Sequence, residues 1–254
     1  MENSRTPGPI DEQFKARMDQ VIRNSQKYML HIQKNGRFWW GELESNPTME
    51  SEYLMLTYFL GVEDWTRWRK ISKYILSKQQ KDGSWVQYYD APGDLSTSVE
   101  CYAALKLAGI PEDSQCMIRA RDFILSKGGV PKARIFTKIW LALIGEYSWN
   151  DIPNMLPELI LLPTWFPFNI YAFSSWARAT IVPMTIILTE KPVKPVPLHA
   201  SIRELYPKQD EGGYPIPKPT QLVPNWHNLF LGIDKLIHIL QKLSIKPIRS
   251  RAKD

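Results

Sequence analysis

The sequence is poor in the residues that most often bind metals or act as nucleophiles. Its 254 residues include only two cysteines, Cys101 and Cys116, and four histidines, with no metal-ligand or triad spacing among them. A glycine-rich phosphate loop is absent as well. We therefore expect no metal, no cofactor and no disulfide scaffold, and inert thiols in a reducing compartment.

Charge is missing from one long stretch of the chain. No charged residue occurs from Leu159 to Ala177, a run of nineteen residues. The length approaches that of a membrane span, but Pro163, Pro167 and Asn169 weigh against one. We expect buried segments that line an apolar cavity instead. Residues 1–11 are polar and contain Pro and Gly, so no secretory signal is expected there.

The positive charge of the chain is concentrated at one end. The net charge is +6, and residues 235–254 carry six Lys or Arg against Asp254 alone. The other 234 residues are close to neutral, which argues against a broad nucleic-acid surface. Two interpretations of the basic tail remain open. It contacts anionic lipid, or it is a solvated linker.

Aromatic residues are abundant. The chain has ten Trp, eleven Tyr and nine Phe, more than core packing usually requires. Such an excess has two common explanations. One is a surface that binds a polyene or a carbohydrate, and the other is a set of anchors at a membrane interface.

An internal repeat organises the first part of the chain. The string ILSK occurs at residues 75–78 and again at 124–127, 49 residues later. Glu52 lies nine residues before Gly61, and Glu100 lies nine before Gly109. A period near 48 residues with Gly at helix ends is typical of stacked helical hairpins. Because no segment shows strand alternation, we predict an all-α fold, either an α/α barrel (toroid) or an open solenoid.

Each repeat also carries a Gln/Gly/Trp box. Residues 79–85 fit the pattern QxxxGxW, and residues 33–39 form a first copy with its Gly one step early. We expect the Gly to turn the chain after an outer helix and the Trp to fold back and stack on the Gln amide. The boxes are therefore interpreted as stabilising devices that carry no chemistry.

The pattern divides the chain into three parts. Residues 1–32 form an N-terminal arm and a helix with one apolar stripe, and residues 33–205 form the α/α-barrel domain. Residues 206–254 comprise the Pro-rich connector, an amphipathic helix and the basic tail. The whole stretch from 192 to 224 contains eight prolines in 33 residues, which indicates an extended, rigid connector outside the core. The last helix is expected at residues 226–243, packed on the barrel or lying in a lipid headgroup layer.

Three strings give the chain a family resemblance. They are FWWGELESNPTMESEYLMLTYFL at 38–60, DGSWVQYYDAPGDLSTSVECYAALKLAG at 82–109 and FNIYAFSSWARATIVPM at 168–184. Together with KLSIKPIRSRA near the end, they resemble the N-terminal half of squalene–hopene cyclases. The resemblance implies an α/α barrel that pairs with a second barrel around an apolar cavity, monotopic membrane binding, and conversion of squalene into hopene or hopanol.

The resemblance also implies an acid that this sequence does not contain. In that family the initiating proton comes from a DxDD motif in the second barrel, and no DxDD string occurs here. We assign no catalytic residue and expect the chain alone to be inactive, because protonating an alkene requires a tuned acid in a dry site. A complementary half that bears DxDD, or a second copy of the chain, would be its partner.

Seven residues match cavity positions of the family. Trp176 matches a tryptophan that faces the cavity and stabilises cations through its π face, although a core role is the alternative from the sequence alone. Phe173 and Ile181 match positions that narrow the substrate channel, or belong to the core. The remaining four match positions that order water at the far end of the cavity: Glu52, Glu100, Arg134 and Trp140.

Residue chemistry leaves further alternatives. A buried Glu52 or Glu100 needs a partner, and Arg134 is available for a bidentate ion pair. Arg178 is expected to pair with an acid of a neighbouring helix. Rival functions are a non-catalytic isoprenoid-binding or interaction module, and a glycan-processing toroid that uses Glu52 and Glu100 as acid and base. We expect a squalene-like isoprenoid ligand, no nucleic acid, and a cytoplasmic location, at most peripheral on the inner face of the membrane.

Overall fold

The fold was analysed in a computed structural model, which describes residues 11–41, 44–153, 155, 157–166 and 169–207. These residues are helical and contain no strand, only two isolated bridges, which confirms the all-α prediction. The chain divides after Glu44 into two units. The α-helices are α1 (Glu12–Ile32), α2 (Thr48–Leu60), α3 (Trp65–Ser77), α4 (Leu95–Leu107), α5 (Gln115–Ser126), α6 (Ile135–Leu143) and α7 (Ser175–Glu190). Short 3₁₀ turns are η1 (Val130–Lys132), η2 (Trp149–Asp151), η3 (Pro157–Leu161), η4 (Ile170–Ala172), η5 (Leu198–Ala200) and η6 (Arg203–Leu205).

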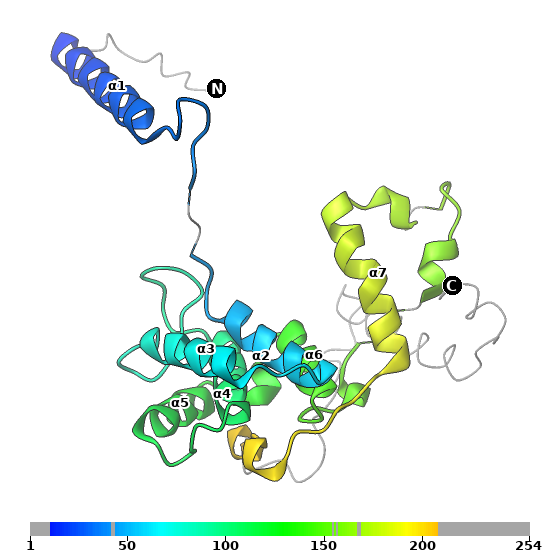
Figure 1. The fold of residues 1–254 in the computed structure, drawn as a ribbon. Helices are drawn as coiled ribbons and strands as arrows, with labels where there is room; N and C mark the ends of the chain where they lie inside the picture. Colours follow the sequence, from blue (N-terminus) through cyan, green and yellow to red (C-terminus); the bar gives the residue numbers. More distant parts are fainter. Residues whose placement is uncertain (1–10, 42–43, 154, 156, 167–168, 208–254) are drawn as a thin grey trace, which may run out of the picture. The chain divides into compact units, whose positions relative to one another are not determined.

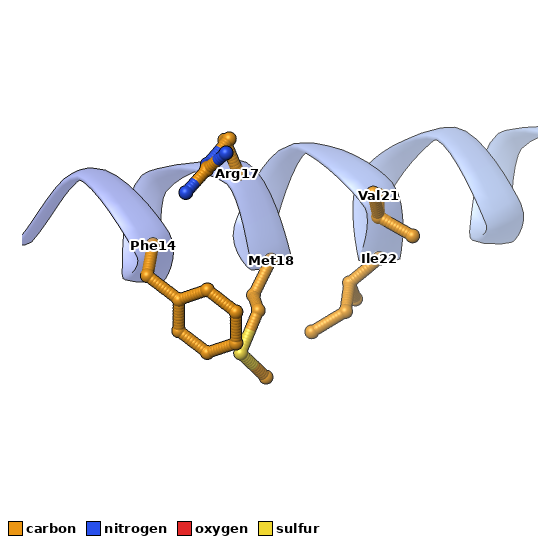
Figure 2. A pocket seen from close by; sticks show the side chains of 5 residues that line it. All are labelled: Phe14, Arg17, Met18, Val21 and Ile22. Atoms are coloured by element: carbon orange, nitrogen blue, oxygen red, sulfur yellow. The ribbon is translucent and has the colours of Figure 1, made fainter. Parts of the chain in front are cut away.

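The first unit consists of α1 and the first box. The Asp11 side chain caps α1 by accepting a hydrogen bond from the backbone N–H of Gln13. Phe14, Met18 and Ile22 extend from one side of the helix (Figure 2) and help to line a shallow pocket. At the far end, the Trp39 indole N–H donates to the carbonyl of Met29 over 2.7 Å. The first box therefore folds back on its own helix.

The second unit begins with two consecutive helical hairpins, α2/α3 and α4/α5, followed by α6 (Figure 1). We call α2–α6, residues 48–143, the hairpin stack. Gly61 ends α2 with φ +74°, and the Asp64 side chain caps α3, so the predicted stop and start signals operate. In the centre, α4 packs against α2, α3, α5 and α6, and every residue after Leu95 is buried. Closure of the stack into a barrel remains a prediction.

The second box ties one hairpin to the next. Trp85 is 0% exposed, and its indole N–H donates to the carbonyl of Ile75 over 2.7 Å. The Gln79 amide donates to the carbonyls of Gly83 (3.0 Å) and Cys116 (2.8 Å). These hydrogen bonds give the box a stabilising role, while stacking of Trp85 on the Gln79 amide remains a prediction.

Beyond the stack, residues 157–190 form η3, η4 and α7. The uncharged run within this segment was expected to be buried, and that expectation is wrong for most of its described residues, although Asn169 and Ile170 are buried. Its most exposed large apolar side chains are Leu161, Trp165, Tyr171, Phe173 and Trp176. The C-terminal half of α7 is different, because Thr185 and Leu188 are buried and Met184 packs against the core. Among the described residues, therefore, mainly the C-terminal half of α7 is covered by the core.

Residues 191–207, which we call the return segment, run back over the stack. Lys194 and Val196 donate backbone hydrogen bonds to the carbonyls of Leu143 (2.8 Å) and Ile144 (3.1 Å). The segment is extended apart from η5 and η6, as its prolines predict. Its exclusion from the core was a wrong expectation, because Ala200, Ile202 and Leu205 are buried in the core.

An ion network fixes the end of the return segment to α4. The buried Lys106 ammonium lies 2.7 Å from carboxylate oxygens of both Glu112 and Glu204. Tyr102 donates its hydroxyl hydrogen to the same Glu204 oxygen over 2.8 Å. Burial lowers the pKa of Lys106, but these carboxylates raise it more, so the ammonium stays charged.

Among the described residues, none of the helices combines the length and the apolar character needed to cross a bilayer. The helix predicted at 226–243 and the basic tail lie outside the described residues, as does most of the part predicted to follow the barrel domain.

Candidate functional site

Glu100 occupies the middle of α4 and is 0% exposed. The Arg134 Nη2 atom lies 3.4 Å from both of its carboxylate oxygens. The hydroxyl of Thr137 donates a third hydrogen bond to Glu100. The predicted pair with Arg134 therefore forms, but a single guanidinium nitrogen makes both contacts, so it lacks the fork geometry of a bidentate pair.

The environment of Glu100 favours its neutral form. The pKa of this carboxyl is raised to about 7, chiefly by burial and also by the charge of Glu52, although Thr137 and Arg134 act to lower it. A group with this pKa exchanges a proton near neutral pH. It is far too weak an acid to protonate an isolated alkene.

Glu52 lies on α2 and is half-buried. Burial raises the pKa of its carboxyl, whereas a hydrogen bond from Trp140 and the charge of Arg134 lower it. Trp140 belongs to α6, and Arg134 is the residue that precedes this helix. The start of α6 is fixed to α4, because the backbone N–H of Arg134 donates to the Ser96 hydroxyl over 2.9 Å.

The structure thus brings together four of the seven predicted cavity residues: Glu52, Glu100, Arg134 and Trp140. Two carboxyls, a guanidinium and an indole N–H supply both donors and acceptors, which suits the ordering of a water molecule or a polar group. Complete burial of Glu100 argues against the glycan-processing alternative, because a sugar has no access to its carboxyl. Thr137 belongs to the same cluster and was not predicted.

The other three predicted residues lie together along the chain at η4 and α7. Trp176 is in the first turn of α7 and is 86% exposed, so it is not a core tryptophan of the described chain. Phe173 is exposed and Ile181 is half-buried. Their role in lining a cavity or channel remains a prediction. Trp165, which is 80% exposed, is a further surface aromatic that was foreseen only as part of the uncharged run.

The remaining candidate residues are the cysteines, possible metal ligands and Arg178. Cys101 is buried and accepts a hydrogen bond from the Ser51 hydroxyl, and burial raises the pKa of its thiol well above its usual range. No group of His, Cys, Asp and Glu within the described ranges has the arrangement of a metal site. Arg178 was expected to pair with an acid, and none of the described residues forms that pair.

Comparison with known proteins identifies relatives along most of the chain. The family model described as squalene-hopene cyclase N-terminal domain matches residues 22–254. The squalene–hopene cyclase of Alicyclobacillus acidocaldarius is 42% identical over 226 residues, which cover 89% of this chain and 35% of the relative. Dammaradiene synthase of Dryopteris crassirhizoma is 36% identical over 233 residues, or 91% of this chain and 34% of the relative.

The pattern extends to other bacteria. The squalene–hopene cyclase of Zymomonas mobilis is 34% identical over 241 residues, covering 92% of this chain and 35% of the relative. This chain thus spans about a third of the length of the curated relatives it matches. The family model and these identities, together with the helical hairpins and their boxes, show that the chain belongs to the squalene–hopene cyclase N-terminal domain family.

Proposed function

We propose that this domain forms one wall of an apolar cavity in which a second, DxDD-bearing barrel cyclises squalene or a related isoprenoid. The observation that carries the proposal is the exposure of Trp176 on α7. An exposed indole on a firmly held helix is costly in water and useful only when another surface or a ligand covers it.

Two features support a cavity wall of this kind. The C-terminal half of α7 is packed on the core through Met184 and Leu188, so the exposed half is held in a defined position. Four exposed side chains of 157–190 are aromatic, Trp165, Tyr171, Phe173 and Trp176, and aromatic π faces stabilise the carbocations that a cyclisation generates. If this domain supplied the acid for cyclisation, a carboxyl would be expected close to these aromatic side chains.

The Glu100 cluster contributes at a second point in this proposal. Glu52 and Glu100 act with Arg134 and Trp140 to hold water or shape the far end of the substrate. Their raised pKa values suit a group that accepts a proton better than one that delivers it to an alkene. The strongly acidic step is therefore assigned to the second barrel.

Squalene turnover, followed by gas chromatography with mass detection, tests the proposal. The chain is assayed alone and after co-expression with a DxDD-bearing second barrel, and polycyclic product is expected only from the pair. Product from the chain alone would contradict the proposal. Squalene binding without product in the pair would favour the non-catalytic isoprenoid-binding module.

A substitution links the product to the surface. Trp176→Ala is expected to reduce or alter the product of the pair while the chain remains folded. Tyr89→Ala is the matched control, because Tyr89 is also exposed but follows the second box instead of lying on α7. Equal effects of the two substitutions would remove the support for a cavity role of Trp176.

The proposal includes peripheral association with the inner face of a membrane, from which an apolar substrate is taken. The cationic residues of 235–254 and the exposed aromatics of 157–190 support it. The purified chain is expected to pellet with anionic vesicles and to detach as salt concentration rises. Recovery in the supernatant at every salt concentration would contradict this part of the proposal.

A further inference from the structure

Arg178 is the sole charged residue between Leu159 and Thr189, a stretch of 31 residues. It lies on α7, where it is half-buried, and it makes no ion pair with any residue that the structure describes. A single cation retained in an otherwise uncharged segment calls for a specific counter-charge, because covering an unpaired guanidinium with apolar groups is strongly unfavourable.

The position of Arg178 on α7 shows which side of the helix needs that counter-charge. Residues three or four apart share one face of a helix, so Arg178, Ile181, Thr185 and Leu188 form one stripe. This stripe is buried at Thr185 and Leu188 and half-buried at Ile181 and Arg178. Trp176, two positions before Arg178, points away from the stripe. The face that the core covers at one end of α7 therefore carries the lone arginine at the other.

We propose that the protein surface that covers the N-terminal half of α7 carries a carboxylate that pairs with Arg178 and fixes how the two surfaces align. This inference rests on the proposed function, in which a second barrel covers α7. Arginine suits the role because its planar fork matches a carboxylate and remains charged at any physiological pH. The apolar residues around Arg178 provide the buried contact area, and the ion pair of Arg178 fixes the relative orientation of the two surfaces.

Two other sources of negative charge fit the observations less well. Anionic lipid is recognised by clusters of several Lys or Arg, whereas this segment offers one cation. Residues 208–254 of the same chain contain eight Lys or Arg against four Asp or Glu, so they bring net positive charge. A carboxylate on a separate protein surface avoids both difficulties.

The experiment compares variants of the full chain in complex with a second barrel. The probe is the remaining part of the Alicyclobacillus acidocaldarius squalene–hopene cyclase, beyond the region that matches this chain, co-expressed with it and recovered as a complex. The variants are Arg178→Met, which keeps the length of the side chain and removes its charge, and Arg178→Lys, which keeps the charge and removes the fork. Arg69→Met makes the same change at an exposed arginine on α3 and serves as the control.

The direction in which Arg178→Met changes the dissociation constant shows whether a carboxylate faces Arg178. If a carboxylate faces Arg178, the variant leaves that carboxylate unpaired and raises the dissociation constant of the complex by about 30-fold or more. Arg178→Lys is expected to have a smaller effect of the same sign, and Arg69→Met none. The midpoint of urea unfolding of the isolated chain is expected to be the same for all variants.

Five results would overturn the proposal, and they differ from one another. Tighter association of Arg178→Met would mean a purely apolar covering surface. A loss of stability of the isolated chain would place the acid within the chain itself. Weaker binding to phosphatidylglycerol vesicles with unchanged protein association would identify a phosphate instead. Failure of the wild-type chain to form the complex would defeat the proposed function as well, whereas wild-type association that ignores Arg178 would defeat the present inference alone.

Discussion

The hairpin stack and the segment 157–190 are both rich in aromatic residues, yet they treat them in opposite ways. In the stack, Trp68 and Trp85 are fully buried and their indole N–H groups donate to Thr57 and to the carbonyl of Ile75. In the segment, Trp165 and Trp176 face solvent. The comparison shows that a high aromatic content alone does not predict burial. Whether a given aromatic side chain is buried depends on which other residues of the fold pack against it. Four substitutions test it.

The largest effect is expected from Trp85→Ala in the stack. The indole is fully buried and donates to α3, so its removal creates a cavity and leaves the Ile75 carbonyl without its donor. We expect a loss of about 3–5 kcal/mol in the free energy of unfolding, measured by urea denaturation. A loss below about 1 kcal/mol would mean that burial in the stack and exposure on α7 differ little in energy.

The second largest loss of stability is expected from a substitution at Gly83, in the turn of the second Gln/Gly/Trp box. Gly83 has φ +88°, and a Cβ at this position would lie 2.4 Å from the backbone carbonyl of Arg119. Gly83→Ala is therefore expected to cost about 2–4 kcal/mol, from left-handed strain and overpacking together. Gly109→Ala is the matched control, because Gly109 has φ +84° with no atom within 4 Å. Equal losses in the two variants would show that backbone strain alone matters and that the contact between hairpins does not.

The third prediction is that the free energy of unfolding depends on pH, because the buried core of the stack contains the carboxyl of Glu100. The folded-state pKa of Glu100 is raised from 4.5 to about 7. Between these values the unfolded chain releases a proton that the folded chain retains, so the free energy of unfolding decreases as pH rises. The decrease reaches about 3 kcal/mol at most. Glu100→Gln should flatten this dependence in urea denaturation. If the stability difference between wild type and variant instead rises across the window, Glu100 is ionised in the fold.

The smallest effect is expected from Trp176→Ala in isolation. Because the indole is exposed, its removal should change the free energy of unfolding by about 0.5 kcal/mol or less. Urea denaturation beside Trp85→Ala makes the contrast direct. A loss of several kcal/mol would place Trp176 in the core of the chain and break the comparison.

The sequence predicts the local features of this fold well. The repeated ILSK strings, the glycines that end helices and the Asp residues that cap them each act over a few residues, and the hairpins form where these signals lie. The cluster of Glu52, Glu100, Arg134 and Trp140 also follows from the repeat and the family resemblance. Thr137 was not predicted, because nothing in the sequence around a threonine in an apolar helix indicates which side chain it will hydrogen-bond.

Long-range features were predicted less well, for a physical reason. Whether Trp176 is buried, or whether Ile202 enters the core, depends on surfaces far away in sequence, and composition alone does not reveal them. Proline at 192–207 correctly predicted extended backbone, yet extended backbone can lie on a core as well as leave it. The burial of Ile202 and Leu205 became visible only with the structure.

The return segment determines how this domain can be exchanged between proteins. A Cβ on Gly129 would lie 2.4 Å from the carbonyl oxygen of Leu205, so the two segments of the chain that meet here fit only as a matched pair. A chimera joined at Glu190, where α7 ends, would separate Gly129 from Leu205 and Lys106 from Glu204. A junction after Pro207 keeps both pairs from one parent, and recombination between relatives is expected to yield folded protein at that second position and not at the first.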